Sequence, residues 1–370
     1  MEHRDGVPTR HEIAAIKPIK EHAEDELLRR PGVVGVDLGE KVRGGRGTGQ
    51  PSILIFVTRK KPEAELASDE LIPAEIEGVP TDVQEMVIEL QSARQRVEEG
   101  RQVDGSRYPV LAGGISMGPS RAVSLAPPDV AEEGEYTFVG TLGALVRDRG
   151  SGAVMAMTNF HVACVDDQWS AGDRMVQPGR PDGGNPASDE FGTLTRAQLT
   201  ENTDGAVVSL DEGRQWSAEV TGVGSVTGIA EAAPGLEVQK RGRTTEHTAG
   251  TVASTEASLS LDYGDGLGSR TFRRQVRITT DAERSERFSD GGDSGSVVLD
   301  ADRRVVGLLF AGSTDGSTTF ANPIAAVLEQ LDVEVQVGQP AEEPEVPPAA
   351  GTGGCTVAVT IGTVNITVNH

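Results

Sequence analysis

From residue 113 onward, short runs of apolar and β-branched residues alternate with turns rich in Gly, Asp and Asn. The runs recur at roughly ten-residue spacing, which is typical of a β-barrel or a β-sandwich. One amphipathic helix follows them, at residues 323–331. The strands predicted from this pattern are 137–146, 153–159, 219–226, 250–252, 275–279, 296–299 and 305–310. Residues 113–336 are therefore predicted to form a mainly β domain.

The first 90 residues have a different pattern. A helical stretch around 19–29 ends at Pro31-Gly32, because these residues stop helices. Three strands are predicted to follow, at 33–38, 52–58 and 81–88. These elements predict a small α+β unit. The polar stretch 91–112 is then expected to be a linker, so that residues 1–112 form an N-terminal domain with its linker.

The end of the chain predicts a linker rich in Pro, Gly and Glu at 337–354 and a β-hairpin at 355–370. The alternation changes phase at Gly362-Thr363, which fits a two-residue type II′ turn. Six β-branched residues then share one face: Val357, Val359, Ile361, Val364, Ile366 and Val368. Because an isolated hairpin is marginal in water, we expect this face to dock. Docking against other copies predicts a homo-oligomer, and docking on its own chain is the rival.

Composition narrows the class of protein. The 370 residues include 46 Gly, 20 Pro and 4% aromatics, which fits many short strands and turns. With 34 basic and 57 acidic residues the net charge is −23, which argues against a nucleic-acid partner. No apolar run approaches the roughly 18 residues of a membrane span, so no membrane partner is expected.

Two further features predict where the protein resides. The N-terminus leads into no apolar stretch, so we expect no standard secretory signal. The two cysteines, Cys164 and Cys355, fit a reducing compartment or at most one bridge. Both observations predict a cytoplasmic protein, and whether the two cysteines pair stays open.

His161 follows an apolar strand, 153–157, in the sequence Thr-Asn-Phe-His161-Val. Four of the six histidines lie in charged segments or at a terminus. Asp204 opens a second apolar strand, in Thr-Asp204-Gly-Ala-Val-Val. Taken alone, each of these two residues also has a purely structural explanation. His161 would be a buried histidine whose hydrogen bonds are satisfied, and Asp204 would be a turn residue at the start of a strand.

The third pattern is more specific. Ser294 lies in Gly-Gly292-Asp-Ser294-Gly-Ser, directly before an apolar strand. Glycines around a serine let the backbone turn tightly and present two N–H groups to one point. We predict that the Gly292 and Ser294 amides form an oxyanion hole.

The chemistry requires the three patterns together. A serine hydroxyl is a weak nucleophile until a base removes its proton, and a buried carboxylate orients the imidazole that does so. We therefore predict that Ser294 attacks, His161 is the base and Asp204 orients His161. Asp189 or Asp166 in place of Asp204 is the alternative for the acid.

The order His161, Asp204, Ser294 and the sequences around these residues resemble the chymotrypsin-fold serine peptidases. The sequence Arg-Gly-Arg-Thr-Thr-Glu-His-Thr-Ala-Gly-Thr-Val at 241–252 is similar to a hairpin of the bacterial streptogrisin-like branch. This resemblance covers about residues 113–332 and implies a two-barrel peptidase domain. Residues 31–90 and 140–148 resemble bacterial trypsin-like proteins that share a layout with plant Narrow Leaf proteins.

The departures from this family bear on location and specificity. Secreted streptogrisin-like enzymes carry disulfides near the histidine and the hairpin, where this chain lacks cysteine pairs. The resemblance places the floor of the specificity pocket at Phe288 and its wall at Phe310, Ala311 and Gly312. Without an acid at the floor, a preference for Arg or Lys is not expected. An aromatic floor would favour small apolar side chains, although Phe288 packed in the core fits equally well.

The function predicted is a serine endopeptidase that acts on proteins or peptides, without a cofactor or metal. The alternative is a catalytically quiet scaffold or binding module that keeps the trypsin fold and assembles through its terminal additions. A non-peptide esterase has no separate support in the sequence.

Overall fold

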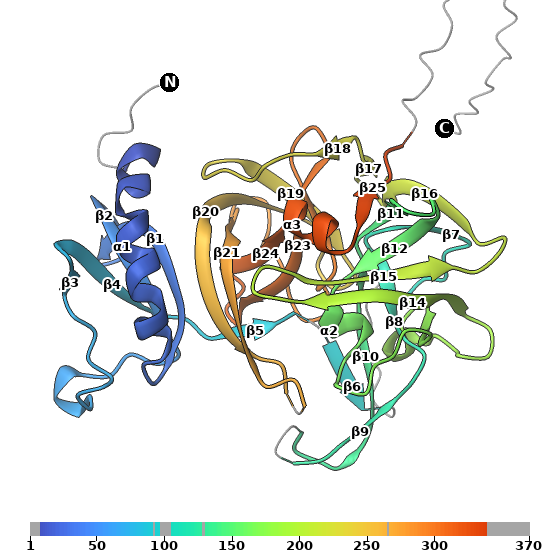
Figure 1. Cartoon of the computed structure of the whole chain (residues 1–370), viewed down its shortest axis with the longest axis horizontal. Helices are drawn as coiled ribbons and strands as arrows, with labels where there is room; N and C mark the ends of the chain where they lie inside the picture. The colour runs from blue at the N-terminus through green and yellow to red at the C-terminus, as the bar shows by residue number, and fades with distance from the viewer. Residues whose placement is uncertain (1–7, 92, 97–104, 128–129, 265, 339–370) are drawn as a thin grey trace, which may run out of the picture. The chain divides into compact units, whose positions relative to one another are not determined.

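The alternating runs of the sequence form antiparallel strands in a computed structural model, which describes residues 8–338 except 92, 97–104, 128–129 and 265 (Figure 1). The strands form two rings, each filled by apolar side chains. The mainly β, two-barrel fold is thereby confirmed. The predicted C-terminal hairpin lies outside the described residues.

The second ring in chain order carries Ser294. The loop that holds this residue, 289–296, is called the serine loop. The strands of this ring follow one another in space, and pairing between the first and the last closes the ring. In that order they are β19 (Glu237–Gly242), β22 (Val297–Leu299), β23 (Arg304–Ser313), β24 (Thr318–Pro323), β21 (Ser269–Thr280) and β20 (Glu246–Asp262). Val238, Val252 and Ile278 are among the buried residues of its interior.

The first ring is closed through β10 and β11, which are separated by Gly143 alone. Its strands in spatial order are β11 (Ala144–Asp148), β12 (Val154–Thr158), β15 (Asp204–Leu210), β14 (Glu190–Leu199), β13 (Arg174–Val176), β8 (Ile115–Pro119) and β10 (Gly134–Leu142). Leu142, Phe191 and Val208 lie in its interior.

A shared apolar cluster joins the two rings. It contains Val146 and Met157 from the first ring and Val297 and Leu308 from the second, together with Val327 of α3. The remaining short elements of this region are β9 (Val123–Leu125), α2 (Phe160–Ala163), η2 (Arg180–Asp182), β16 (Gln215–Val220), β17 (Gly224–Ser225), β18 (Gly228–Ile229), α3 (Ile324–Gln330) and β25 (Val333–Val335).

The N-terminal α+β unit packs a helix on a small sheet. Thr9 begins the helix with a capping box, in which its hydroxyl accepts from Glu12 N at 3.2 Å. Buried residues such as Leu27, Val36 and Ile55 form the core of the unit. Its elements are α1 (Arg10–Leu28), β1 (Val33–Arg43), β2 (Arg46–Val57), η1 (Glu63–Glu65), β3 (Glu75–Ile76) and β4 (Val79–Glu85). No helix in the described ranges is long and apolar enough to cross a membrane.

The sheet of this unit continues into the second ring, because β1 pairs with β20 at Gly35↔Leu259 and Val36↔Ser258. Buried polar contacts add to the pairing: Arg277 Nε lies 2.5 Å from Asp37 Oδ2. The described residues up to Gly338 accordingly form one compact unit. The domain boundary at residue 112 stays a prediction.

The stretch 91–112, expected to be a linker, contains strands instead. β5 (Ile88–Leu90) pairs with β23 just before it, β6 (Ala93–Arg96) pairs with β10, and β7 (Val110–Gly113) pairs with β16. These strands could not be recognised from the sequence, because the stretch as a whole is polar and shows no clear apolar alternation. Backbone pairing with neighbouring strands holds them in place.

Candidate active site

The three residues singled out by the sequence lie together. His161 Nε2 is 2.7 Å from Ser294 Oγ, and His161 Nδ1 is 2.5 Å from Asp204 Oδ2. The other carboxylate oxygen of Asp204 accepts from the His161 backbone N–H at 3.1 Å. All three residues are buried. One imidazole thus links a hydroxyl to a carboxylate.

Strand pairing explains how residues 43 positions apart meet. β12 and β15 are antiparallel neighbours, with Met157↔Val207 and Thr158↔Ala206. The end of β12 therefore lies beside the start of β15, where Asp204 stands. The short helix α2 begins after β12 and carries His161 on its first turn.

Other buried groups fix Asp204 from the remaining sides. Tyr263 Oη donates to Asp204 Oδ2 at 2.6 Å, and Asn159 Nδ2 donates to the Asp204 carbonyl at 2.7 Å. Asn322 Oδ1 accepts from the Asp204 N–H at 3.0 Å. Burial, together with the Asp204 carboxylate, raises the pKa of Tyr263 well above its ordinary value. The phenol therefore stays a hydrogen-bond donor to Asp204.

The serine loop turns as the glycines predicted. Gly292 has φ +104°, and a Cβ on it would collide with Thr244 Oγ1, so a side chain is excluded on both counts. The Gly292 and Ser294 amides converge on one oxygen, the carbonyl of Gln91, at 2.6 and 3.0 Å. Two backbone donors beside a serine hydroxyl are suited to hold the oxyanion that forms on acyl transfer.

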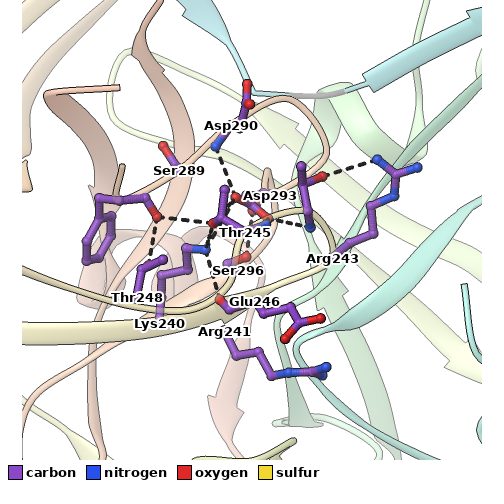
Figure 2. A network of polar contacts seen from close by, with 12 residues as sticks. Lys240, Arg241, Arg243, Thr245, Glu246, Thr248, Ser289, Asp290, Asp293 and Ser296 are labelled. Atoms are coloured by element: carbon purple, nitrogen blue, oxygen red, sulfur yellow. Dashed lines mark hydrogen bonds and ion pairs between the residues drawn. The ribbon is translucent and has the colours of Figure 1, made fainter. Parts of the chain in front are cut away.

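Asp293, between these two amides, is the centre of a buried network (Figure 2). Its Oδ1 accepts from the backbone N–H groups of Thr244 and Thr245, at 2.8 and 3.2 Å. Its Oδ2 accepts from Thr245 Oγ1 at 2.6 Å and from the Asp290 N–H at 3.0 Å. These bonds hold the loop that carries the two converging amides.

A buried cation balances the charge of Asp293. Lys240 Nζ lies 3.3 Å from Asp293 Oδ2, and neither side chain has any solvent exposure. Burial lowers the pKa of Lys240, although the Asp293 carboxylate opposes this shift. The hairpin of β19 and β20 thus supplies the lysine and both threonines of the network.

Nearby, Arg243 adds a second buried ion pair, with Asp182 of the first ring. Its Nε donates to Asp182 Oδ2 at 2.7 Å. Because Arg243 precedes Thr244, this pair fastens the hairpin across the two rings.

The predicted pocket residues divide into two groups. Ala311 and Gly312 pair with Leu90 and Glu89 of β5, and the Phe310 carbonyl accepts from the Gln91 N–H, so these three predicted wall residues lie beside the segment that leads to Gln91. The Phe288 side chain is fully buried in the interior of the second ring. The structure therefore shows the core packing that the sequence left open for Phe288.

The two aspartates considered as alternatives to Asp204 have partners of their own. Asp189 pairs with Arg107, and Asp166 pairs with Arg121, so neither contacts His161. Two polar residues near the hairpin and the serine, His247 and Asp290, contact Gln239 and Arg287 respectively. Among the described residues no cluster of three or more His, Cys, Asp or Glu side chains is arranged to hold a metal.

The contributors that were missed include Lys240, Tyr263 and Gln91. For the first two a signal existed. Lys240 is in phase with buried Val238, and Tyr263 continues the phase of Leu259 and Leu261, so both belonged to inward positions. For Gln91 the sequence offered no signal, because its role depends on pairing across the fold.

The chain is similar to proteins of two kinds. No family model matches it. It is 26% identical over 328 residues to Protein NARROW LEAF 1 of Oryza sativa subsp. japonica, a match that covers 78% of this chain. That match covers 53% of the rice protein, so the chain spans about half the length of the curated relative it matches.

Among solved structures, the chain is similar to bacterial chymotrypsin-fold serine proteases. Thermobifida fusca Protease A is 23% identical, with a TM-score of 0.44, and the match covers 62% of this chain and all of that one. Nocardiopsis protease is 18% identical, with a TM-score of 0.42, and the match covers 61% of this chain and 98% of that one.

Proposed function

We propose that the protein is a serine endopeptidase that cleaves peptide bonds through an acyl-enzyme on Ser294. One observation carries the proposal: His161 is hydrogen-bonded to both Ser294 and Asp204 beside two converging backbone amides. A nucleophile, a base, a residue that orients the base and an oxyanion site are the parts that acyl transfer requires.

In the proposed mechanism, Ser294 Oγ attacks the scissile carbonyl carbon while His161 Nε2 accepts the hydroxyl proton. Asp204 keeps the Nδ1 proton in place and stabilises the imidazolium. The oxyanion accepts hydrogen bonds from the Gly292 and Ser294 amides. His161 then protonates the leaving amine, and a water molecule activated by His161 hydrolyses the ester.

Each part contributes a different share of the rate. Losing the serine removes the covalent route and is expected to lower turnover by about 10⁶-fold. Losing one oxyanion donor typically costs about 2.7–4 kcal/mol of transition-state stabilisation. The Asp293 network is proposed to maintain these donors in position, without itself contacting the substrate.

The direct test is cleavage of a random peptide library by the purified full chain, read by mass spectrometry. We expect cleavage by the wild type and none above background by Ser294→Ala. The matched control is Ser188→Ala, an exposed serine, which should cleave as the wild type does. Equal cleavage by wild type and Ser294→Ala would contradict the proposal.

A catalytically quiet scaffold is the second candidate, and the occupied oxyanion site favours it. Ser294 has no solvent exposure, and a carbonyl of the chain already fills the space beside it. A wild type that never cleaves any peptide would support this candidate. The cytoplasmic location and the homo-oligomer also stay predictions.

A further inference from the structure

A segment of the chain pairs with β23 next to Ser294. Ile88–Leu90 forms β5, which pairs antiparallel with β23 at Ser313, Gly312 and Ala311. Next to this pairing, the Gln91 N–H donates to the Phe310 carbonyl at 3.0 Å, and the Thr314 N–H donates to the Val87 carbonyl at 3.0 Å. The segment therefore extends the second ring by one strand. The residue after this strand, Gln91, is hydrogen-bonded to the Ser294 N–H.

The carbonyl of Gln91 occupies the position of a carbonyl under attack. It accepts from both oxyanion donors, Gly292 N at 2.6 Å and Ser294 N at 3.0 Å. Ser294 Oγ, on the same residue as one donor, lies 2.7 Å from His161 Nε2. The peptide bond next to this carbonyl joins Gln91 to Ser92.

The backbone after this bond continues on the opposite ring. Residues Ala93–Arg96 form β6, which pairs antiparallel with β10, from Val139↔Ala93 to Tyr136↔Arg96. In Figure 1, β5 lies near the strands of the second ring and β6 lies beside β10. The chain thus pairs with β23 before the Gln91–Ser92 bond and with β10 after it. These two pairings hold the chain on both sides of this bond.

The side chain of Gln91 is buried beside uncharged residues, and its Oε1 has no hydrogen-bond partner. It is 5% exposed, and a Cβ added to Gly312 would lie 2.8 Å from Gln91 Nε2 and 3.1 Å from Ser289 Oγ. Ser289 Oγ in turn lies 2.6 Å from Thr319 Oγ1. A glycine and two hydroxyls leave room for a glutamine amide but supply no charge to pair with an ionic side chain.

The preceding side chains alternate between core and solvent. Ile88 is buried, and Leu90 packs against the same apolar cluster, which includes Phe310. Glu89 faces solvent. The surroundings of the segment therefore suit a glutamine before the bond and apolar residues at the positions occupied by Leu90 and Ile88.

On the basis of the proposed function, we infer that the protein cleaves its own Gln91–Ser92 peptide bond. Ser294 Oγ bonds to the Gln91 carbonyl carbon, and its proton passes to His161. The C–N bond then breaks, and His161 returns the proton to the nitrogen of Ser92, which becomes a new N-terminus. Water hydrolyses the Gln91 ester, which releases Ser294 and leaves a carboxylate on Gln91.

The two pieces are expected to remain associated after cleavage. The N-terminal piece is held by the β1–β20 pairing and by the buried pair of Asp37 with Arg277. Glu24 of α1 also accepts from Ser258 of β20 at 2.7 Å. Cleavage would therefore leave one particle in solution, made of residues 1–91 and 92–370.

Intact-mass spectrometry of the full chain under denaturing conditions tests the inference. We expect two species in the wild type, one beginning at Ser92, and a single uncut chain in Ser294→Ala. Because the segment is already bound, the rate should not depend on protein concentration. A cut in both proteins, a cut at another bond, or a rate proportional to concentration would overturn the inference.

The surroundings of Gln91 supply a second test. Gln91→Lys places an unpaired charge beside these uncharged residues, so self-cleavage should slow by about 100-fold. The control Gln50→Lys changes an exposed glutamine and should cleave as the wild type does. Equal rates for both variants would overturn the inference. If Gln91→Lys does not fold, added peptides Ile-Glu-Leu-Gln-Ser-Ala and Ile-Glu-Leu-Lys-Ser-Ala give the same comparison with wild type.

The outcomes separate this inference from the proposed function. A wild type that stays uncut but cleaves added peptides after glutamine is a peptidase inhibited by its own segment, so self-cleavage fails alone. A wild type that cuts neither itself nor any library peptide contradicts both proposals.

Discussion

Two fully buried aspartates, Asp204 and Asp293, lie on either side of the serine, one in each ring, and their surroundings differ in kind. Asp204 is bonded to an imidazole, a phenol and backbone and amide groups, none of which carries a permanent charge. Asp293 is bonded to the ammonium of Lys240 and to three backbone N–H groups. The negative charge of Asp204 can therefore stabilise His161 when the imidazole gains a proton. The negative charge of Asp293 is already balanced by Lys240.

This difference teaches that burial alone does not assign a role to a carboxylate. Both groups are removed from water, so both need compensation. For Asp204, full compensation would arise only when the imidazole becomes charged, which happens during the proposed reaction. For Asp293, compensation is permanent, so its charge stabilises the loop in every state.

The largest effect on peptide turnover should come from removing the hydrogen bond between Asp204 and His161. Asp204→Asn removes the acceptor for the Nδ1 proton, so the imidazole adopts the wrong tautomer and cannot accept the serine proton. We expect peptide turnover to fall by about 10⁴-fold. The control Asp300→Asn changes a buried carboxylate paired with Arg304 instead of His161. An equal loss of turnover in both variants would show that burial, not position, decides.

The next effect concerns stability. Lys240→Met removes the cation and leaves Asp293 buried without balance, so the free energy of unfolding should fall by about 3–5 kcal/mol. Urea denaturation measures this loss.

The double variant Lys240→Met with Asp293→Asn checks the cause. Because no charge is then left unbalanced, we expect it to recover most of the lost stability. A double variant as unstable as Lys240→Met would mean that packing of the lysine stem, not its charge, matters.

A smaller effect sharpens the description of Asp204. Tyr263→Phe removes a hydrogen bond to the oxygen that also faces His161, so more negative charge is left for the imidazolium. The acidic limb of the pH–rate profile should move to higher pH, by less than about one unit. Tyr136→Phe is the control, since its hydroxyl donates to the Glu132 carbonyl instead. A profile that does not move would refute a role for Tyr263 in tuning the charge.

Glu24 provides an intermediate case, with the smallest expected effect. Burial alone would raise its pKa, but hydrogen bonds from Lys20 and Ser258 and the charges of Lys20 and Arg273 lower it overall. A lowered pKa means stability that is present above the ordinary value of 4.5 and is lost as the pH falls through the folded value. The free energy of unfolding, measured by urea denaturation, should therefore fall as the pH drops below about 4.5, and Glu24→Gln should weaken this dependence. An unchanged dependence in Glu24→Gln would assign the effect to other carboxylates.

The sequence was sufficient to identify the candidate site residues that lie at the ends of apolar strands. His161, Asp204 and Ser294 each occupy such a position, and the glycines around Ser294 required a tight turn. The sequence was insufficient where pairing across the fold decides. Of the 17-residue strand β20, only 250–252 was predicted, because its Ser, Thr and Glu residues weaken the apolar alternation. Gln91 was missed for the same reason, since the amides that bind its carbonyl belong to Gly292 and Ser294, far along the chain.

The length of β20 has a consequence for anyone who wishes to shorten the protein. One end of this strand pairs with β19, and the other end pairs with β1 of the N-terminal unit. Removing residues before 113 would leave the backbone around Ser258 and Leu259 as an exposed sheet edge. Unprotected edges invite pairing with other chains, so a truncated two-ring region is expected to aggregate. The N-terminal unit thus covers this edge of the second ring, whether or not the bond after Gln91 is intact.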